Sequence, residues 1–262
     1  MRVLIVLFCL NLPSYVLACQ QPITINYAPF VSLLVVDKFF GSFHEQLEKT
    51  SGCPVDFIIQ RNFDEFVSAL FHREHTLAIV PGPYFNVLKQ LDYLAVASQL
   101  VEEQRAVLVI AKKKRGWNGL TDLIGHRVLV NSPLSASGSF FLDSAKKQAL
   151  LNQIKIEQRN SYDNMIFSVL KGDADAAAII AEYWGALDEG IRNDHLSIIA
   201  RLEIQASTEF VVLKEREDLI PVIYNALNAG ALKWGKPNDQ AFGPKPLEQL
   251  LQNKLQQFKQ TQ

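Results

Sequence analysis

Four residues in one short turn of the sequence have the chemistry of an anion site: Ser135, Ser137, Gly138 and Ser139. If they begin a helix, its first backbone N–H groups lack partners within the helix and carry the positive end of its dipole. A tetrahedral or carboxylate oxyanion bound there accepts several hydrogen bonds at once. The serine hydroxyls add neutral donors, and Gly138 lets the backbone approach the ligand without a Cβ in the way. Such a site needs no Arg or Lys.

The same residues have a plainer interpretation, which the sequence leaves open. Serine is common at the N-cap of a helix, so one hydroxyl could cap the helix while the others are solvated. Both interpretations need a strand before the turn and a helix after it. The apolar run at 128–130 predicts the strand, Asn131 and Pro133 end it, and the amphipathic run at 140–151 predicts the helix.

The rest of the chain alternates strands with helices, which predicts an α/β fold of βαβ units with mostly parallel sheets flanked by helices. We expect strands or apolar runs at 23–27, 55–59, 77–80, 94–97, 106–111, 154–157, 175–180 and 210–213. Two crossings would divide the chain into two lobes, with residues 22–110 and 203–262 in lobe 1 and residues 112–200 in lobe 2. Closure of the lobes about this hinge is the expected motion.

The ends of these strands supply further candidates, because ligands of such sheets bind beyond the carboxyl ends of the strands. Tyr27, Tyr84 and the serine turn all fall at such ends. Tyr84 is a candidate to bond to or stack on a ligand, or else an aromatic plug under a Pro-rich loop. Ser161 is the expected N-cap of a helix that begins at Tyr162, so that helix would form the opposite wall of the cleft.

Composition and motifs exclude several classes of function. The chain has 262 residues, of which 48% are hydrophobic and 20% charged, values that are ordinary for a folded protein and enough for two lobes. A net charge of −1 provides no basic surface for nucleic acid. The sequence contains no phosphate-binding loop, dinucleotide fingerprint or nucleophile elbow. His72 and His75 are the only close histidine pair, and without clustered ligands they predict no metal and no cofactor.

Residues 1–18 are expected to be an export signal, with a positive start, an apolar run and a small-residue cleavage site before Cys19. The apolar run is too short to span a bilayer. After cleavage the chain would hold two cysteines, and an oxidising compartment would permit a disulfide between Cys19 and Cys53. Residues 16–19 also resemble a bacterial lipobox, apart from Leu17. Lipidation of Cys19 would forbid the disulfide, and both alternatives stay open.

The serine turn and two flanking segments carry a resemblance to a known family. Together with Leu-Thr-Asp-Leu-Ile-Gly-His-Arg at 120–127 and Gly-Asp-Ala-Asp-Ala-Ala-Ala at 172–178, the turn resembles the phosphate- and phosphonate-binding periplasmic proteins, the solute-binding subunits of ABC importers. The similarity extends from residue 25 to about residue 226, and the serine turn is its most specific part. It implies the two-lobed, type 2 periplasmic binding protein fold, with phosphonate oxygens bound at the serine turn.

Departures from the family's pattern bear on the ligand. In the resembling aminophosphonate binders, acidic residues hold the ligand's ammonium group and a histidine precedes the second flanking segment. Here Tyr162 stands at the histidine position, Thr208 near an acidic position and Gln104 at an aromatic position, while the carboxylate of Glu182 is kept. The oxyanion half of the pocket is therefore retained and the cation half largely lost. We expect Glu182 to be exposed, paired with a protein group or in contact with ligand.

We therefore expect an exported, monomeric, non-enzymatic solute-binding protein that holds phosphate, phosphite or a phosphonate between its lobes. Ligand contacts are predicted for Ser135, Ser137, Gly138, Ser139, Tyr84, Ser161, Tyr162 and Glu182. The expected protein partner is an ABC permease or a sensor kinase, and a lipid on Cys19 would be the only link to the membrane. The rivals are a sensor or accessory lipoprotein, and an enzyme that uses Glu182, Tyr162 or Asp163 as acid or base.

Overall fold

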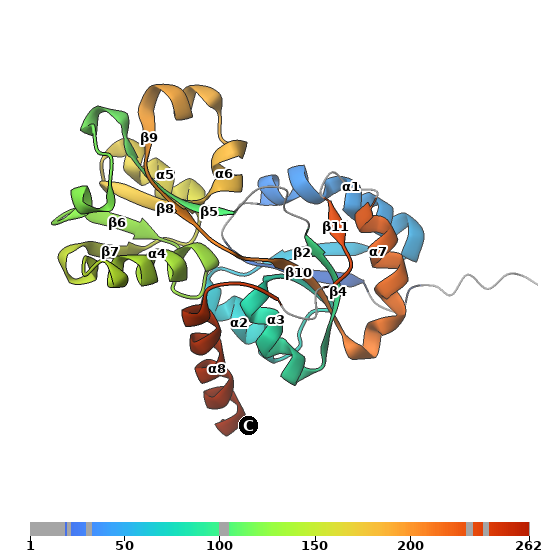
Figure 1. The fold of residues 1–262 in the computed structure, drawn as a ribbon. Helices are drawn as coiled ribbons and strands as arrows, with labels where there is room; N and C mark the ends of the chain where they lie inside the picture. The colour runs from blue at the N-terminus through green and yellow to red at the C-terminus, as the bar shows by residue number, and fades with distance from the viewer. Residues whose placement is uncertain are drawn as a thin grey trace, which may run out of the picture.

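The chain folds into two α/β lobes that lie side by side (Figure 1). The computed structural model describes residue 19 and residues 22–29, 33–99, 105–228, 233–237 and 241–261. The expected export signal at 1–18 and the position of Gln104 lie outside these described residues. No helix within them is long and apolar enough to cross a membrane.

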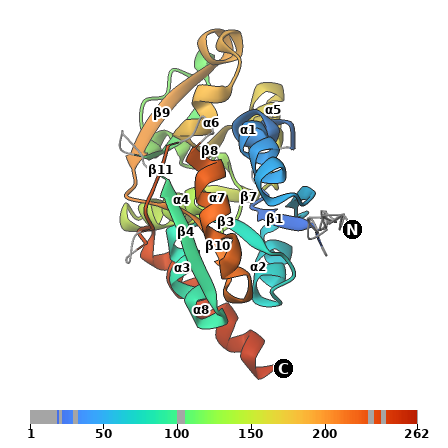
Figure 2. The ribbon, with the colours of Figure 1, turned by 90° about the vertical axis from the view of Figure 1, so that its right-hand side faces the viewer.

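The first lobe is built on a six-stranded sheet in the order β11-β4-β10-β3-β1-β2. Its strands are β1 (Ile23–Tyr27), β2 (Val55–Ile59), β3 (Leu77–Pro81), β4 (Tyr93–Gln99), β10 (Thr208–Leu213) and β11 (Trp234–Gly235). One face is covered by α1 (Leu33–Ser51) and α7 (Ile220–Asn228), which lie side by side in Figure 2. The other face is covered by α2 (Phe63–Phe71), α3 (Gly82–Leu88) and α8 (Lys245–Gln260).

The second lobe is built on a five-stranded sheet in the order β7-β6-β8-β5-β9. Its strands are β5 (Ala106–Lys112), β6 (Arg127–Val130), β7 (Lys155–Gln158), β8 (Ala176–Ile180) and β9 (Leu196–Glu203). On one face, α4 (Ala136–Lys147) buries Phe141 and Ala145 against the sheet. On the other face lie α5 (Tyr162–Lys171) and α6 (Ala181–Ala186). The small side chains of β8 let these helices approach the sheet closely.

Both sheets are mixed: most strands of each sheet run in the same direction, as expected, and antiparallel strands are inserted among them. Strands β2, β1 and β3 are parallel in the first sheet, and β7, β6 and β8 are parallel in the second. By contrast, β10 runs antiparallel to β3 and β4, and β5 runs antiparallel to β8 and β9. Each of β5 and β10 follows a crossing from the other lobe. Each of these two strands therefore enters its sheet at the carboxyl ends of the parallel strands and runs antiparallel to them.

The structure corrects the predicted boundary at residue 110, where the first segment of lobe 1 was expected to end. Residues 106–110 belong to β5, which pairs with β8 and β9 in the second sheet. Residues 106–111 of this strand are all buried and apolar, so their types do not show which sheet the strand joins. The first crossing therefore precedes Ala106, and the second lies between Glu203 and Thr208. The two crossings touch, because the Ile204 N–H donates to the Arg105 carbonyl at 2.8 Å.

Two short helices follow strands directly, one of them where the sequence suggested a loop. Residues that read as a Pro-rich turn form α3, which has proline in its first turn, where the missing N–H is tolerated. Residues directly after β8 form α6, which carries Glu182. Both helices begin at the carboxyl end of a strand, so both direct side chains toward the region between the lobes.

Cys19 and Cys53 form a disulfide, with their Cα atoms 5.1 Å apart. The bridge ties Cys19, four positions before the first strand, to the turn that follows α1. A sulfur in a disulfide has no valence left for a lipid thioether. Of the two alternatives, the structure has the disulfide, and a chain with this disulfide is not lipidated at Cys19.

Candidate binding site between the lobes

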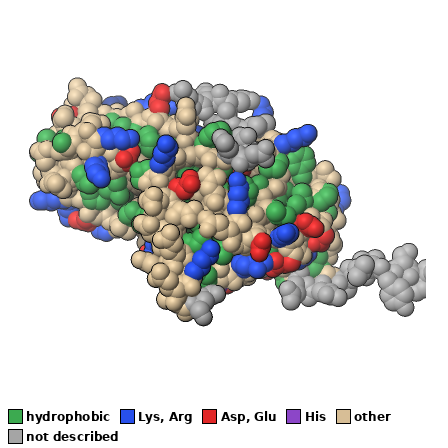
Figure 3. Space-filling model, turned by 60° about the horizontal axis from the view of Figure 1, so that its bottom comes forward, with side chains coloured by type: hydrophobic (Ala, Val, Ile, Leu, Met, Phe, Trp, Pro, Cys, Tyr) green, Lys and Arg blue, Asp and Glu red, His purple; other side chains and the backbone are tan. Residues whose placement is uncertain are grey.

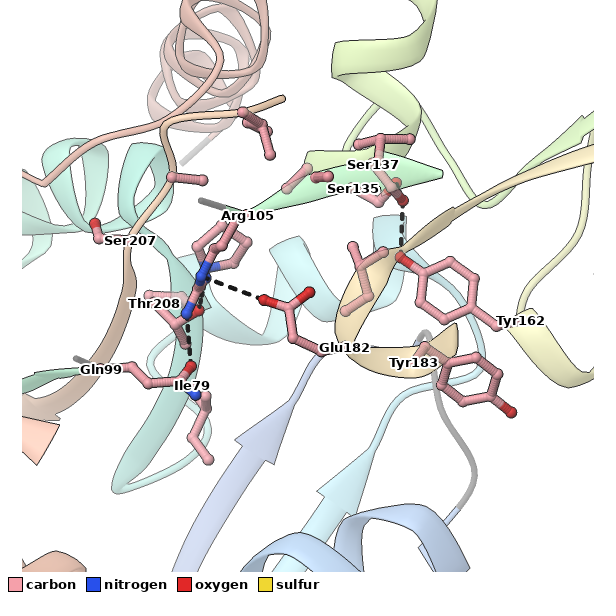
Figure 4. A pocket seen from close by; sticks show the side chains of 18 of the residues that line it. Ile79, Gln99, Arg105, Ser135, Ser137, Tyr162, Glu182, Tyr183, Ser207 and Thr208 are labelled. Atoms are coloured by element: carbon pink, nitrogen blue, oxygen red, sulfur yellow. Dashed lines mark hydrogen bonds and ion pairs between the residues drawn. The ribbon is translucent and has the colours of Figure 1, made fainter. Parts of the chain in front are cut away.

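A cavity of about 220 Å³ lies between the lobes, at the carboxyl ends of β1 and β3 (Figure 4). The second lobe closes it with the start of β5, the first turn of α4 and the starts of α5 and α6. This is the place where ligands of α/β sheets bind. Its lining consists of Tyr27, Phe40, Phe63, Ile79, Val80, Pro81, Gln99, Arg105, Ala106, Val107, Ser135, Ala136, Ser137, Tyr162, Ile180, Glu182, Tyr183, Ile204, Ala206, Ser207 and Thr208.

Ser135 is the N-cap of α4 and uses its hydroxyl inside the turn. Its Oγ accepts a hydrogen bond from the Gly138 N–H at 2.9 Å and donates one to the Ser132 carbonyl at 2.8 Å. The plainer interpretation of a capping serine is thus right for this residue, although its side chain also lines the cavity.

Ser137 lies in the first turn of α4 and meets Tyr162 at the cavity wall. The two hydroxyl oxygens are 2.8 Å apart, and both side chains are only 1% exposed. Burial raises the pKa of Tyr162, while the hydrogen bonds to Ser137 and the Ile180 backbone lower it by less. Tyr162 therefore remains a neutral hydroxyl. The structure brings these two predicted residues together from α4 and α5.

Gly138 and Ser139 are buried behind the cavity wall and are not among the residues that line it. A Cβ on Gly138 would lie 2.1 Å from the Ser132 carbonyl oxygen. The glycine is therefore required by the close approach of the turn to its own helix, and not by a ligand as predicted. Ser139 donates its backbone N–H to the Ser135 carbonyl, as the first full turn of α4 requires.

Tyr84 and Ser161 also lie outside the lining. The Tyr84 hydroxyl, on α3 of the first lobe, donates to the Leu134 carbonyl of the second lobe at 2.7 Å. Its ring is 1% exposed, so Tyr84 is the buried plug of the two predicted alternatives. Ser161 caps α5 by accepting from the Asn164 N–H at 3.3 Å. Both residues hold elements that carry lining side chains.

Arg105 is a charged lining residue that the sequence did not reveal. Its guanidinium donates to Thr208 Oγ1 and to Gln99 Oε1, both at 2.6 Å, and its Nε lies 3.4 Å from Glu182 Oε1. The side chain is 12% exposed. Burial lowers the pKa of Arg105, and the carboxylates of Glu182 and Glu209 raise it. In the sequence it follows two glutamates and a glutamine and so resembles part of a solvated charged loop.

Glu182 meets two of the three expectations for it, because it is exposed and is also paired with a protein group. Its side chain is 43% exposed, and its partner Arg105 is bonded to the first lobe. In the view of Figure 4, Glu182 stands between Arg105 on one side and Ser137 with Tyr162 on the other. The cavity thus has a hydroxyl-lined wall and, across from it, an internal ion pair.

Two other kinds of site considered from the sequence, a metal site and a nucleic-acid-binding surface, were compared with the described part of the chain. Within the described residues, no three His, Cys, Asp or Glu side chains gather as a metal site. On the face drawn in Figure 3, Lys and Arg side chains are interspersed with Asp and Glu. A mixed surface of this kind differs from the basic stripe of a nucleic-acid-binding face.

Two α/β lobes, two crossings and a cavity at the hinge define the class of two-lobed periplasmic binding proteins. Within this class, the chain belongs to the family described as the phosphonate periplasmic substrate-binding protein of ABC transporters, whose model matches residues 25–242. The family is one of substrate-binding proteins that work with a membrane transporter, and its members are periplasmic. No curated protein sequence matches the chain.

Solved structures share this fold at low sequence identity. PhnD1 from Prochlorococcus marinus, in complex with methylphosphonate, is 18% identical with a TM-score of 0.70 over 89% of this chain and 98% of that one. A binding protein component of an ABC phosphonate transporter from Pseudomonas aeruginosa is 14% identical, with a TM-score of 0.69 over 92% and 87%. The alkanesulfonate-binding protein SsuA from Xanthomonas axonopodis, bound to MOPS, is 18% identical, with a TM-score of 0.56 over 79% and 71%.

Proposed function

We propose that the chain captures a small oxyanion, namely phosphate, phosphite or a phosphonate, between its lobes and delivers it to an ABC permease. The position of Ser137 carries the proposal, because this residue is both in the first turn of α4 and at the cavity wall. The N–H groups of Gly138 and Ser139 bond back to Ser135. The N–H groups of Ala136 and Ser137 have no acceptor within the helix, and both residues line the cavity.

The charges around the cavity support an anionic ligand. The N-terminus of α4, a helix of 12 residues, favours negative charge through its dipole and its free N–H groups. Ser137 and Tyr162 add neutral donors. Charge-assisted hydrogen bonds contribute about 1.5–3 kcal/mol each, so three or four support micromolar binding after the costs of closure.

We also infer that the site binds its ligand without catalysis. Each candidate acid or base already has a partner. Tyr162 bonds to Ser137, Glu182 pairs with Arg105, and Asp163 accepts a short hydrogen bond from Tyr183. Burial raises the pKa of Tyr162, so its phenol is held neutral and is a poor base for activating the Ser137 hydroxyl.

Export through residues 1–18 and action as a monomer complete the proposal. The disulfide at Cys19 supports export, because such bridges persist in oxidising compartments. The periplasmic character of the family supports it as well.

The replacement Ser137→Ala tests the proposed function. Titration calorimetry with phosphate, phosphite and methylphosphonate should show at least about a tenfold loss of affinity, since one hydrogen bond to a charged oxygen is removed. Ser144→Ala is the matched control, because Ser144 is on the same helix but away from the cavity. If the wild type binds one of these anions and Ser137→Ala binds it with the same affinity, Ser137 does not contact the ligand. No binding of any of the three anions would refute the proposed function.

A further inference from the structure

The cavity contains a cation that belongs to the protein. Arg105 is fixed to the first lobe by Gln99 on β4 and Thr208 on β10, each at 2.6 Å. Its Nε lies 3.4 Å from a carboxylate oxygen of Glu182, on α6 of the second lobe, so the two side chains form an ion pair without a hydrogen bond (Figure 4). The ion pair therefore joins the two lobes across the space that a ligand would occupy.

We propose that Arg105 determines the class of ligand, by occupying the place beside Glu182 where an amino group would bind and so selecting phosphonates with an uncharged, apolar substituent. This inference rests on the proposed function, which leaves the substituent unspecified. Glu182 is a carboxylate at the cavity wall and is the natural partner of an ammonium group. With Arg105 in place, that carboxylate is already paired.

An ammonium group on the ligand would meet two obstacles. It would have to displace a guanidinium that two further hydrogen bonds hold in position. It would also lie close to that guanidinium in a partly buried site, where screening by water is weak and like charges repel. An uncharged substituent meets neither obstacle, so the tethered cation discriminates against amines without touching the oxyanion.

The lining provides for the uncharged substituent. Much of the cavity lining is apolar, with Tyr27, Phe40, Phe63, Ile79, Ile180 and Ile204. The cavity of about 220 Å³ leaves room beyond a bare tetrahedral anion. Burial of alkyl or aryl carbon against these side chains stabilises the complex.

Two isosteric ligands test the inference. Propylphosphonate and 2-aminoethylphosphonate have the same number of heavy atoms and differ in a methyl and an ammonium group. Titration calorimetry of the wild type should give a dissociation constant at least about tenfold lower for propylphosphonate, the discrimination that one charged contact provides. In Arg105→Met, Glu182 is released and the ratio of the two constants should move at least about tenfold toward the amine.

Two further variants separate the proposed cause from general damage. In the double variant Arg105→Met with Glu182→Gln, the shift in affinity toward 2-aminoethylphosphonate should disappear, because the carboxylate that would pair with its ammonium group is removed. Arg115→Met removes the same charge from a surface pair with Asp175 and should keep the wild-type ratio. Thermal unfolding of each variant checks that the fold is intact.

The outcomes distinguish this inference from the proposed function. A wild-type preference for the amine overturns the inference. The inference is also overturned if Arg105→Met keeps the wild-type ratio of the two dissociation constants. This includes the case in which Arg105 binds the oxyanion directly, because the affinities for both phosphonates would then fall together. If the folded wild type binds neither phosphonate nor phosphate, the proposed function itself fails.

Discussion

At the scale of single residues, the hydroxyls of Ser137 and Tyr162 explain how a neutral wall can receive an anion. One of the two donates to the other at 2.8 Å, so the pair retains a second proton. The other two polar atoms near Ser137 Oγ are Asn131 Oδ1 and Ser135 Oγ, each at the long distance of 3.4 Å. A ligand oxygen at hydrogen-bonding distance would compete well for that proton, which makes the pair a donor to anions.

Gly138 gives a prediction about stability at this scale. In Gly138→Ala the new Cβ would lie 2.1 Å from the Ser132 carbonyl oxygen, so the turn before α4 must shift. Overpacking of this kind should lower the free energy of unfolding by at least about 2 kcal/mol, measured by urea denaturation. Gly119→Ala is the control, because its Cβ would meet only Thr121 Oγ1 at 3.8 Å. Equal stabilities of the two variants would contradict this role of Gly138.

At the scale of elements, short helices at the ends of strands make contacts that link the two lobes. The helix α3 carries Tyr84, whose hydroxyl binds the Leu134 carbonyl in the turn that leads into α4. The helix α6 carries Glu182, which reaches back to Arg105. Each lobe thus holds the other through an element that begins at the carboxyl end of a strand.

Tyr84→Phe tests this link between α3 and the turn before α4. Loss of the hydroxyl leaves a buried carbonyl unpaired, and the free energy of unfolding should fall by about 1–3 kcal/mol. Phosphonate affinity should fall as well, because the turn that carries Ser135 is less well held. Tyr93→Phe is matched to it, since the Tyr93 hydroxyl binds the Leu70 carbonyl at 3.0 Å within the first lobe. That variant should lose stability but keep its affinity, and an equal loss of affinity in both would contradict the link.

At the scale of the whole molecule, covalent and hinge connections determine which motions remain. The disulfide fixes the start of the first lobe, and the backbone bond between Arg105 and Ile204 joins the two crossings. Rotation about the crossings changes the distance between the serine turn and the first lobe while each sheet stays intact. This is the hinge closure that a cleft ligand would stabilise.

The disulfide yields a prediction for the whole chain. Cys53→Ser opens a bridge between residues 34 apart and should lower the free energy of unfolding by about 2–4 kcal/mol. Treatment of the wild type with a reductant should reproduce the loss, while the variant should not respond. The processed wild type should also show no free thiol and no added lipid in its intact mass. A lipid on Cys19 would contradict the bridge.

The sequence by itself determined the alternation of strands and helices, the helix beginning near Ser135 and the cap at Ser161, because these depend on residue types a few positions apart. It also indicated the family, through the serine turn and its two flanking segments. Ser137 and Tyr162 were predicted at opposing helix starts for the same local reason.

Only the tertiary structure decided which of these residues share the cavity wall. The sequence could not assign β5 to the second sheet, since a strand buried on both faces looks the same in either one. Nor could it assign Arg105 to the cavity, because its partners come from β4, β10 and α6, as far as 103 residues away. Contacts between distant segments depend on how the lobes pack together, and that arrangement leaves no periodic trace in the order of the amino acids.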